Sequence, residues 1–408
     1  MKKVYIFLTH SIDNVAGAQL YISRKMGYLA SNGWVVDCYY HYQNEIMIDN
    51  FVQYAGNYIP ELHLKLSWVS EKRKKEIVAH IIKYTASELV VIESHTISTA
   101  VWGEYFAEKL GARHICYLLS ETFPTLSMSM KSFFLYKKEQ HLLFGICNKS
   151  IPALLKGYSG LENLGLAAVG SISFTVEDIY DERVEKIRKA DYNILSIGRL
   201  EKAYVPDMVQ SIITFANEFA RSVINVYIIG SSRKKEVVDN ILCSLHKTPN
   251  IQCFYFGYTF PIPRSIFVKS DVCIASSGSV KVAFEEGVPT IAVDGNDHQA
   301  IGIYGHTTKE TLFRNANEPP VKIADLLKQI LVYKQYSNEA GIHIRKGTLD
   351  YSEHQKIIDR PYDHTYYPVE KMCNVRDKFI SLLGGKGLKI LVKTYKFMMR
   401  FSLSAHQN

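Results

Sequence analysis

Residues 272–294 have the sequence VCIASSGSVKVAFEEGVPTIAVD. A short apolar strand ends in a polar turn at 276–279, and the pattern predicts a helix from about Val280. Gly287 ends this helix, and a second apolar strand begins at Thr290. A strand, a turn, a short helix and another strand in this order predict a βαβ unit in a parallel sheet.

The turn of this unit also has the chemistry of an anion site. Its residues Ser277, Gly278 and Ser279 place hydroxyl groups and backbone N–H groups where the helix begins. Such a junction can cradle a phosphate group. A structural cap and turn would use the same residues, so the motif alone leaves both interpretations open.

Apolar strands alternate with helical patterns through both halves of the chain. In the first half we expect strands at 4–9, 35–40, 89–94 and 114–119, and helices at 18–32 and 99–110. In the second half we expect strands at 192–200, 225–232, 251–258, 272–277 and 289–294, and helices at 207–220 and 234–246. Residues 171–191 are charged, offer no strand candidate and are predicted to link the halves. The pattern predicts the α/β class, with domains at 1–170 and 171–370.

The end of the chain differs from both halves. Residues 335–370 are rich in Tyr, His and charge, and their weak periodicity predicts irregular surface. The tail combines lysines with Leu, Ile, Val and Phe, which predicts a C-terminal helix at about 371–408. This helix is expected to pack on the N-terminal domain, and the alternative is a basic amphipathic helix on an anionic membrane face.

Composition limits the class of partner and the compartment. The net charge of +8 favours anionic partners, but no nucleic-acid-binding motif accompanies it, so nucleic acid is not expected. The seven scattered cysteines predict reduced thiols in a cytoplasmic protein. The apolar run at 4–8 is too short for a signal peptide, and no stretch of about 18 apolar residues predicts a membrane-spanning helix. No histidine or carboxylate spacing indicates a protein-bound metal.

Two further loops carry candidate ligand-binding residues. The first strand leads into small residues around Gly17, where a helix N-terminus can accept an anion. In the second half, a strand ends at Gly198 and is followed by Arg199 and Lys202. Ligands of open parallel sheets bind beyond the carboxyl ends of the strands, and two cations there suit a diphosphate leaving group. Ordinary surface cations are the alternative.

These segments resemble, in order, those of the GT-B glycosyltransferases of group 1, or family 4, which build bacterial surface polysaccharides from nucleotide sugars. The stretches are AGAQLYISRKMGYLASNGWVVDCY, IESHT, ILSIGRLEK, the pair NVYIIGSS and FYFGY, and SDVCIASSGS…EEGVPTIAVD. The resemblance covers roughly residues 1–310. It implies two Rossmann-like domains that face each other across a cleft, with the donor nucleotide held by the C-terminal one.

The resemblance also implies roles for individual residues. His95 would lie at the cleft near the transferred sugar, and Arg199 and Lys202 would neutralise the diphosphate. The implied donor-binding residues are Gly17, Gly198, Tyr258, Ser277, Gly278, Ser279, Glu285 and Glu286. A strand-end histidine held by local hydrogen bonds is the alternative for His95, and a solvated helix face is the alternative for the two glutamates.

The sequence departs from the family pattern in the donor segment. Many relatives that retain the anomeric configuration have two glutamates eight positions apart, the second five residues before the glycine of the G-x-P turn. Ile274 and Val282 occupy those positions here. The basic residue of the family commonly falls where this chain has Tyr204. These changes leave the stereochemistry and the catalysis open and affect the fold much less.

The expected activity is that of a hexosyltransferase-type glycosyltransferase. It would move a sugar from a nucleotide-sugar donor to a hydroxyl of a glycan or lipid-linked acceptor, without a cofactor. The expected location is the cytoplasm, with peripheral contact at the inner face of the membrane if the tail binds lipid. Two alternatives are a nucleotide-sugar epimerase on the same fold and a non-catalytic relative that binds a glycan or a partner enzyme.

Overall fold

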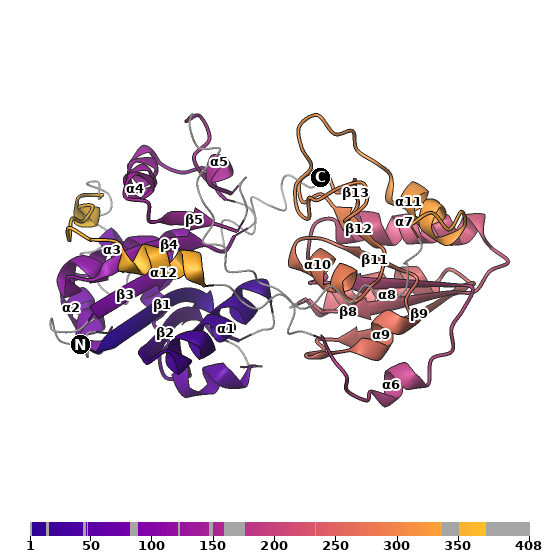
Figure 1. Cartoon of the computed structure of the whole chain (residues 1–408), viewed down its shortest axis with the longest axis horizontal. Coiled ribbons are helices and arrows are strands. Elements are labelled where there is room, and N and C mark those ends of the chain that lie inside the picture. Colours follow the sequence, from indigo (N-terminus) through magenta and orange to yellow (C-terminus); the bar gives the residue numbers. More distant parts are fainter. Residues whose placement is uncertain are drawn as a thin grey trace. The chain divides into compact units, whose positions relative to one another are not determined.

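The computed structural model describes residues 2–13, 16–43, 46, 48–81, 89–120, 123–146, 150–158, 176–232, 234–336 and 351–372. The chain divides into two compact units, which are coloured from indigo to yellow along the sequence in Figure 1. The unit here called the N-terminal domain comprises Met1–Val169 and Tyr351–Asn408, and the C-terminal domain comprises Gly170–Asp350.

The N-terminal domain is built on a five-stranded parallel sheet with the order β2-β1-β3-β4-β5. Its strands are β1 (Lys3–Ser11), β2 (Trp34–Tyr42), β3 (Leu89–Ser94), β4 (Arg113–Leu118) and β5 (Leu143–Gly145). Its α-helices before the C-terminal domain are α1 (Gly17–Ser31), α2 (Glu71–Ile81), α3 (Ile97–Leu110), α4 (Met128–Glu139) and α5 (Ser150–Leu154). Short 3-10 turns are η1 (Asp49–Tyr54), η2 (Pro60–His63) and η3 (Leu66–Trp68).

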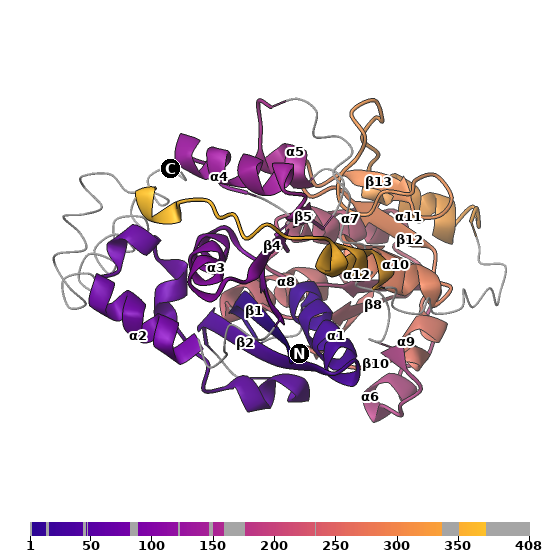
Figure 2. The ribbon, with the colours of Figure 1, turned by 60° about the vertical axis from the view of Figure 1, so that its left-hand side comes forward.

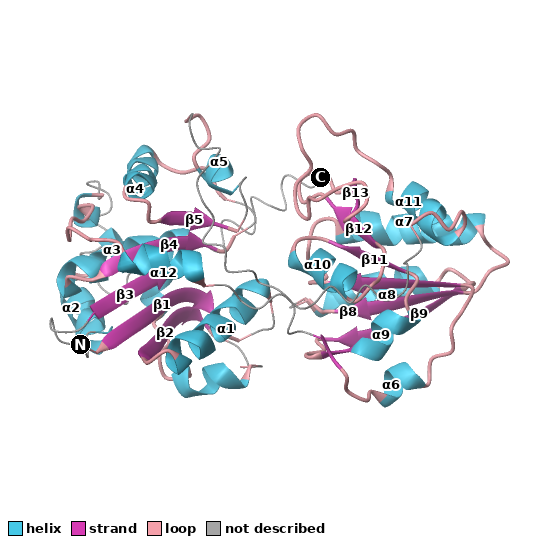
Figure 3. Ribbon diagram, viewed as in Figure 1, coloured by secondary structure: helices cyan, strands magenta, loops and turns pink. Residues whose placement is uncertain are grey.

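Helices cover both faces of this sheet, as Figure 3 shows. Side chains alternate between the two faces of a strand, so β1 contributes to two layers. Val4 and Ile6 join the apolar core that also contains residues of α3. Tyr5 and Phe7 face α1, because the Lys25 ammonium of α1 lies 5.0 and 6.0 Å from the centres of their rings.

The chain returns to the N-terminal domain after the C-terminal domain is complete. Helix α12 (Ser352–Asp359) lies beside α1 in Figures 1 and 2, and the rings of Tyr28 and Tyr351 stack at 4.1 Å. At the other end of α12, the Arg113 guanidinium donates to the carbonyl groups of Ile357, Ile358 and Arg360. The last short turn, η4 (Val369–Lys371), packs its Val369 into the same core.

This return corrects two expectations for residues 351–372. They contain a helix where mainly irregular surface was expected, and they belong to the N-terminal domain although the second domain was expected to end at 370. The physical reason is that their contacts are to α1 and β4, hundreds of positions earlier, which no local pattern records. The predicted helix at 371–408 lies outside the described residues, apart from its first two positions.

The C-terminal domain has a six-stranded sheet with the order β13-β12-β11-β7-β8-β9, in which only β13 is antiparallel to its neighbour. The strands are β7 (Tyr192–Ile197), β8 (Ile224–Ile229), β9 (Ile251–Gly257), β11 (Val272–Ala275), β12 (Thr290–Val293) and β13 (Ala300–Ile303). The helices are α6 (Glu182–Glu185), α7 (Val205–Glu218), α8 (Lys235–His246), α9 (Arg264–Lys269), α10 (Gly278–Glu285) and α11 (Ile323–Leu331). Two cores, one on each face, contain alternate residues of the same strands, such as Ile194 and Leu195 of β7.

The βαβ unit expected at 272–294 is confirmed as β11, α10 and β12. The segment 171–191 differs from expectation within its described part. It contains a short strand, β6 (Val176–Glu177), which pairs in parallel with β10 (Ile262–Pro263). Two residues are too short to give a periodic signal, so only the partner strand reveals this one.

Candidate functional site

Each of the two large sheets has one topological switch point. The chain runs from β7 to β8 and later returns on the other side of β7 to β11, and it runs from β1 to β2 and returns to β3. Ligands of parallel α/β sheets bind beyond the carboxyl ends of the strands at such a point. The loops after β7 and β11, and those after β1 and β3, are therefore the candidate positions.

Arg199 and Lys202 lie on one turn directly after β7. The N–H of Lys202 donates to the carbonyl oxygen of Arg199 at 3.3 Å. The Arg199 side chain is 45% exposed, and its Nη1 atom lies 3.5 Å from Oε1 of Glu201. An exposed ion pair of this kind is weak, so an anionic ligand can compete for the guanidinium.

Glycines at the ends of three neighbouring strands bring their main chains together. Gly198, Gly230 and Gly257 have φ values of 153°, 125° and 67°. A Cβ atom on Gly230 would lie 2.0 Å from the carbonyl oxygen of Gly198, so this position admits only glycine. The N–H of Gly230 donates to the carbonyl oxygen of Gly257 at 2.7 Å. The predicted donor-binding residue Gly198 thus belongs to a set of closely packed loops.

Helix α10 begins beside the Arg199 turn. Its N-cap residue Ser277 has φ 64° and ψ −137°, and its side chain makes no capping hydrogen bond. The first N–H groups of a helix, here those of Gly278 and Ser279, have no acceptor within the helix. β11 is paired with β7, with Ala275 opposite Ile197, so the helix start and the Arg199 turn follow adjacent strand ends. Helix amides and a guanidinium in this arrangement suit a phosphate group.

The other candidates of this domain are less clearly placed for ligand binding. Tyr258 directly follows β9 and is partly buried. Glu285 and Glu286 lie at the far end of α10, about 10 Å along the helix from its start. Glu286 forms an ion pair with Arg264, so its carboxylate is engaged within the domain. Burial and the charge of Glu285 raise the pKa of Tyr304.

In the N-terminal domain, Gly17 is the first residue of α1. A Cβ atom there would meet no other atom within 4 Å, so the main chain is open at this position. Gln19, two residues further, is buried, and its amide donates to the carbonyl and hydroxyl oxygens of Ser11 at 3.0 and 3.1 Å. Gln19 therefore fixes the end of β1 against the start of α1.

His95 follows β3 at the switch point of this domain. Its N–H donates to the carbonyl oxygen of Leu8 at 3.0 Å, and its side chain is almost fully buried. Its Nε2–H donates to Oε1 of Glu93 at 2.9 Å. Among the described residues, no group forms a hydrogen bond with its buried Nδ1 atom. Burial lowers the pKa of His95 despite the opposing effect of Glu93, so the ring is neutral.

Glu93 is the centre of a buried group of polar side chains, here called the Glu93 cluster. Its members are Tyr5, Tyr21, Lys25, Glu93, His95 and His354. The Tyr21 hydroxyl donates to Oε1 of Glu93 at 2.8 Å, and Lys25 and Tyr5 donate to Oε2. His354 of α12 lies 2.6 Å from Nζ of Lys25 and 3.5 Å from Oε2 of Glu93.

The charges of this cluster compensate one another. Burial alone would raise the pKa of Glu93, but Lys25 and the two histidines outweigh it and hold that pKa well below its ordinary value. Burial lowers the pKa of Lys25 to about 8, and burial together with Lys25 lowers that of His354 to about 4. At neutral pH the carboxylate is ionised and both histidines are neutral.

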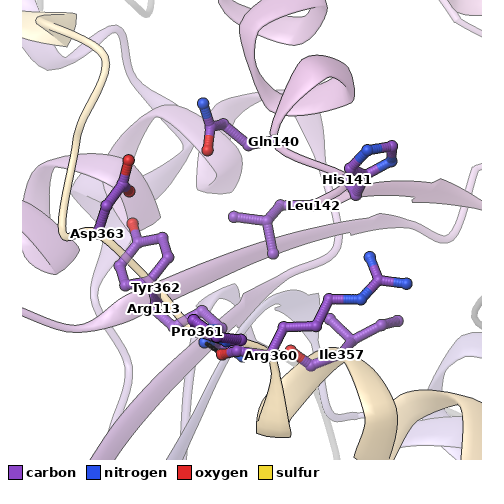
Figure 4. Close-up of a pocket in the computed structure, with 9 residues that line it drawn as sticks. All are labelled: Arg113, Gln140, His141, Leu142, Ile357, Arg360, Pro361, Tyr362 and Asp363. Atoms are coloured by element: carbon purple, nitrogen blue, oxygen red, sulfur yellow. Dashed lines mark hydrogen bonds between the residues drawn. The ribbon is translucent and has the colours of Figure 1, made fainter.

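A cavity of about 400 Å³ lies away from both switch points, and Figure 4 shows the residues that line it. They include Arg113 and Leu142 at the amino ends of β4 and β5, together with Ile357 and Arg360 of the α12 end. The cavity is therefore at the edge of the N-terminal sheet opposite to His95. Ligands of such sheets bind at the carboxyl edge, so this cavity is not the candidate site.

Sequence reasoning missed all members of the Glu93 cluster except His95. One signal was present, because Glu93 is a carboxylate in the otherwise apolar strand LVVIES. A charge in a buried strand requires a partner. Its partner Lys25 lies 68 positions earlier, and its partner His354 lies 329 positions after Lys25. No local sequence pattern connects residues so far apart.

No group of three or more His, Cys, Asp or Glu side chains in the part of the chain that the structure describes could hold a metal ion. Likewise, none of the helices within the described ranges is long and apolar enough to span a bilayer.

No family model and no curated protein matches this sequence. Solved structures of similar fold include HepE from Anabaena in complex with UDP-glucose, which is 13% identical, covers 87% of this chain and 98% of that chain, and has a TM-score of 0.54. A glycosyltransferase from Rickettsia africae is 15% identical over 81% of this chain and 87% of its own, with a TM-score of 0.52. OtsA is 14% identical, and the match covers 88% of this chain and 95% of OtsA, with a TM-score of 0.50.

At these identities the similarity establishes the fold. The chain has the GT-B glycosyltransferase fold, built from two Rossmann-like domains. The α/β class expected from the sequence is thereby confirmed.

Proposed function

We propose that this GT-B chain transfers a sugar from a nucleotide-sugar donor to a hydroxyl group of a glycan or lipid-linked acceptor. The observation that carries the proposal is the switch point of the C-terminal domain. There the Arg199 guanidinium and the first amides of α10 follow adjacent strands, and both favour a diphosphate. The binding of UDP-glucose by HepE, a protein of the same fold, supports a nucleotide sugar as the ligand.

In this reaction the protein positions the two substrates and stabilises the charge of the leaving diphosphate. The acceptor hydroxyl oxygen bonds to the anomeric carbon while the bond from that carbon to the diphosphate oxygen breaks, and the released diphosphate takes up the hydroxyl proton. Arg199 and Lys202 stabilise the negative charge that grows on the departing diphosphate, and the amides of Gly278 and Ser279 bind its oxygens. No resident cofactor enters this scheme. In the N-terminal domain, His95 is the residue that we propose to bind a substrate sugar.

We also propose a location for the reaction. The scattered cysteines favour the cytoplasm. The lysines and apolar residues of 371–408 favour peripheral attachment to an anionic membrane face.

Thermal unfolding of the full chain with a panel of UDP-, GDP-, ADP- and CMP-sugars tests the proposal. A ligand at a hundred times its dissociation constant stabilises the folded state by about 2.7 kcal/mol. One nucleotide series should raise the unfolding temperature, and Arg199→Ala should remove the effect. If no series does so, the donor proposal is wrong.

Product analysis then separates the alternatives. Transfer to an added acceptor supports the transferase. Conversion of the nucleotide sugar to an epimer without acceptor identifies an epimerase. Binding without any turnover identifies a non-catalytic relative.

A further inference from the structure

The Glu93 carboxylate joins His95 to a helix from the end of the chain. One oxygen accepts the Nε2–H of His95 at 2.9 Å, and the other accepts from Lys25, which in turn lies 2.6 Å from Nε2 of His354 on α12. Because the His95 ring is neutral and its Nε2 carries the proton, its Nδ1 atom carries a lone pair. That atom is a hydrogen-bond acceptor.

We propose that Glu93 is a positioning residue that presets Nδ1 of His95 to accept a hydrogen bond from a substrate hydroxyl, and that α12 supports it through His354. The inference rests on the proposed function, because the hydroxyl belongs to the donor sugar or to the acceptor. A phosphate oxygen is excluded as the partner of Nδ1, since two lone pairs repel each other.

The unfilled hydrogen-bonding capacity of His95 is the main argument. Buried polar atoms in folded proteins are nearly always hydrogen-bonded, and an exception calls for an explanation. Nδ1 is buried and has no partner among the described residues, while Nε2 is firmly held. His95 also stands at the switch point, where ligands of this fold bind. A hydroxyl donor from a bound sugar satisfies the atom.

A second buried group in the same domain provides the comparison. Glu104, His114 and Lys137 repeat the same three residue types, with Glu104 Oε2 2.7 Å from Nδ1 of His114 and 2.9 Å from Nζ of Lys137. The other ring nitrogen of His114 bonds to Ser94 Oγ at 2.9 Å, so both nitrogens are satisfied. The Glu104 group needs no ligand, and this difference separates His95 from His114.

The hydrogen bonds that Glu93 accepts explain why His95 keeps its proton on Nε2. Tyr5, Tyr21 and Lys25 all donate to the carboxylate, which keeps it ionised, so that it can only accept the Nε2–H of His95 and does not take up its proton. Nε2 of His354 accepts from Lys25, because an ammonium group can only donate, and the proton of the neutral ring is then on Nδ1. Loss of α12 therefore removes an acceptor from the Lys25 ammonium and weakens the hold on Glu93.

The first experiment observes the tautomer directly and does not depend on activity. The full chain is labelled with ¹⁵N-histidine, and His95→Asn identifies the His95 signals. Between pH 6 and pH 8, Nδ1 of the wild type should show the shift of an unprotonated nitrogen, and Glu93→Gln should give a mixture of tautomers. A protonated Nδ1 in the wild type, or the same tautomer in Glu93→Gln, would overturn the proposal.

The second experiment measures the role in transfer, with Glu104→Gln as the matched control. Glu93→Gln should lower kcat by roughly 10- to 100-fold, less than the roughly 10²- to 10⁴-fold of a group that transfers the proton itself, because Glu93 acts only through His95. Glu104→Gln should lower the unfolding temperature and leave kcat within threefold of wild type. Equal losses of kcat in the two variants would show a purely structural role for Glu93.

The donor affinity without acceptor then identifies the hydroxyl. A weaker donor affinity in Glu93→Gln assigns it to the donor sugar, and an unchanged affinity with lowered kcat assigns it to the acceptor. If the wild type binds no nucleotide sugar, the proposed function fails, while the tautomer experiment still decides the positioning of His95. His354→Gln should show the same effects at smaller size.

Discussion

The Nε2 atom of His354 lies 2.6 Å from the Nζ atom of Lys25, although 329 positions separate the two residues in the sequence. Between them, the chain completes one domain, builds the other and returns. The N-terminal domain therefore contains a helix whose synthesis ends only after the C-terminal domain has been made.

Truncation should show that α12 belongs to the N-terminal domain. A chain that ends at residue 350 lacks the stack of Tyr351 on Tyr28 and the hydrogen bonds from Arg113, whereas a chain that ends at residue 372 keeps them. We expect the shorter chain to unfold at a lower temperature than the longer one, measured by circular dichroism. Equal unfolding temperatures would show that α12 adds nothing to the stability of the domain.

Arg113→Ala should loosen α12 specifically. The guanidinium satisfies three carbonyl groups at the end of this helix, and its loss leaves them without that donor. We expect a loss of about 2–4 kcal/mol in the free energy of unfolding and faster hydrogen exchange in 352–359. Arg73→Ala is the control, because its ion pairs with Glu61 and Glu76 are exposed and worth at most about 1 kcal/mol.

Acid should destabilise the N-terminal domain from about pH 6.5 downwards. Burial lowers the pKa of His354 and of His114 to about 4, against about 6.5 in the unfolded chain. The unfolded state takes up the proton first, so the stability present above pH 6.5 is lost as the pH falls towards 4. Each histidine should account for about 2 kcal/mol between pH 6.5 and pH 5.

Urea unfolding at the two pH values checks this expectation. His354→Gln should reduce the acid-induced loss by about 2 kcal/mol, the share of one histidine. His246→Gln, which changes an exposed residue of α8, should leave the loss as in the wild type. An acid-induced loss in His354→Gln as large as that of the wild type would contradict the assignment.

Gly230→Ala should distort the loops at the ends of β7, β8 and β9, next to the proposed nucleotide-sugar site. The added Cβ would lie 2.0 Å from the carbonyl oxygen of Gly198, and φ at this position is 125°. We expect a loss of at least about 2 kcal/mol in stability and weaker nucleotide-sugar binding, measured by urea unfolding and calorimetry. Gly27→Ala on the exposed side of α1 has open space and should instead stabilise the protein by about 1 kcal/mol.

Arg199→Ala should affect ligand binding and leave stability unchanged. The side chain is 45% exposed and its ion pair with Glu201 is long, so little folding free energy depends on it. Loss of one charge-assisted hydrogen bond to a diphosphate should weaken the affinity for the donor by about 10- to 100-fold. Arg221→Ala, an exposed arginine just beyond α7, is the matched control and should bind the donor as the wild type does.

Local patterns predicted most of the sheet strands that carry the candidate site. The strand expected at 89–94 is β3 with the same bounds, and the glycine-ended strands around Gly198, Gly230 and Gly257 all have their expected positions. These features are local. The alternation of side chains along a strand and the conformational freedom of glycine depend only on a few adjacent residues. The expected place of His95 after β3 follows from the same pattern.

By itself, the sequence determined the α/β class, the two alternating halves and the loops that follow β3, β7 and β11. Only the tertiary structure decided that residues 351–372 complete the N-terminal domain and that Glu93 lies between His95, Lys25 and His354. The reason is physical. A strand or a glycine turn arises from neighbouring residues, whereas a buried charge must be compensated by whichever side chains the fold brings to it, irrespective of their separation along the chain.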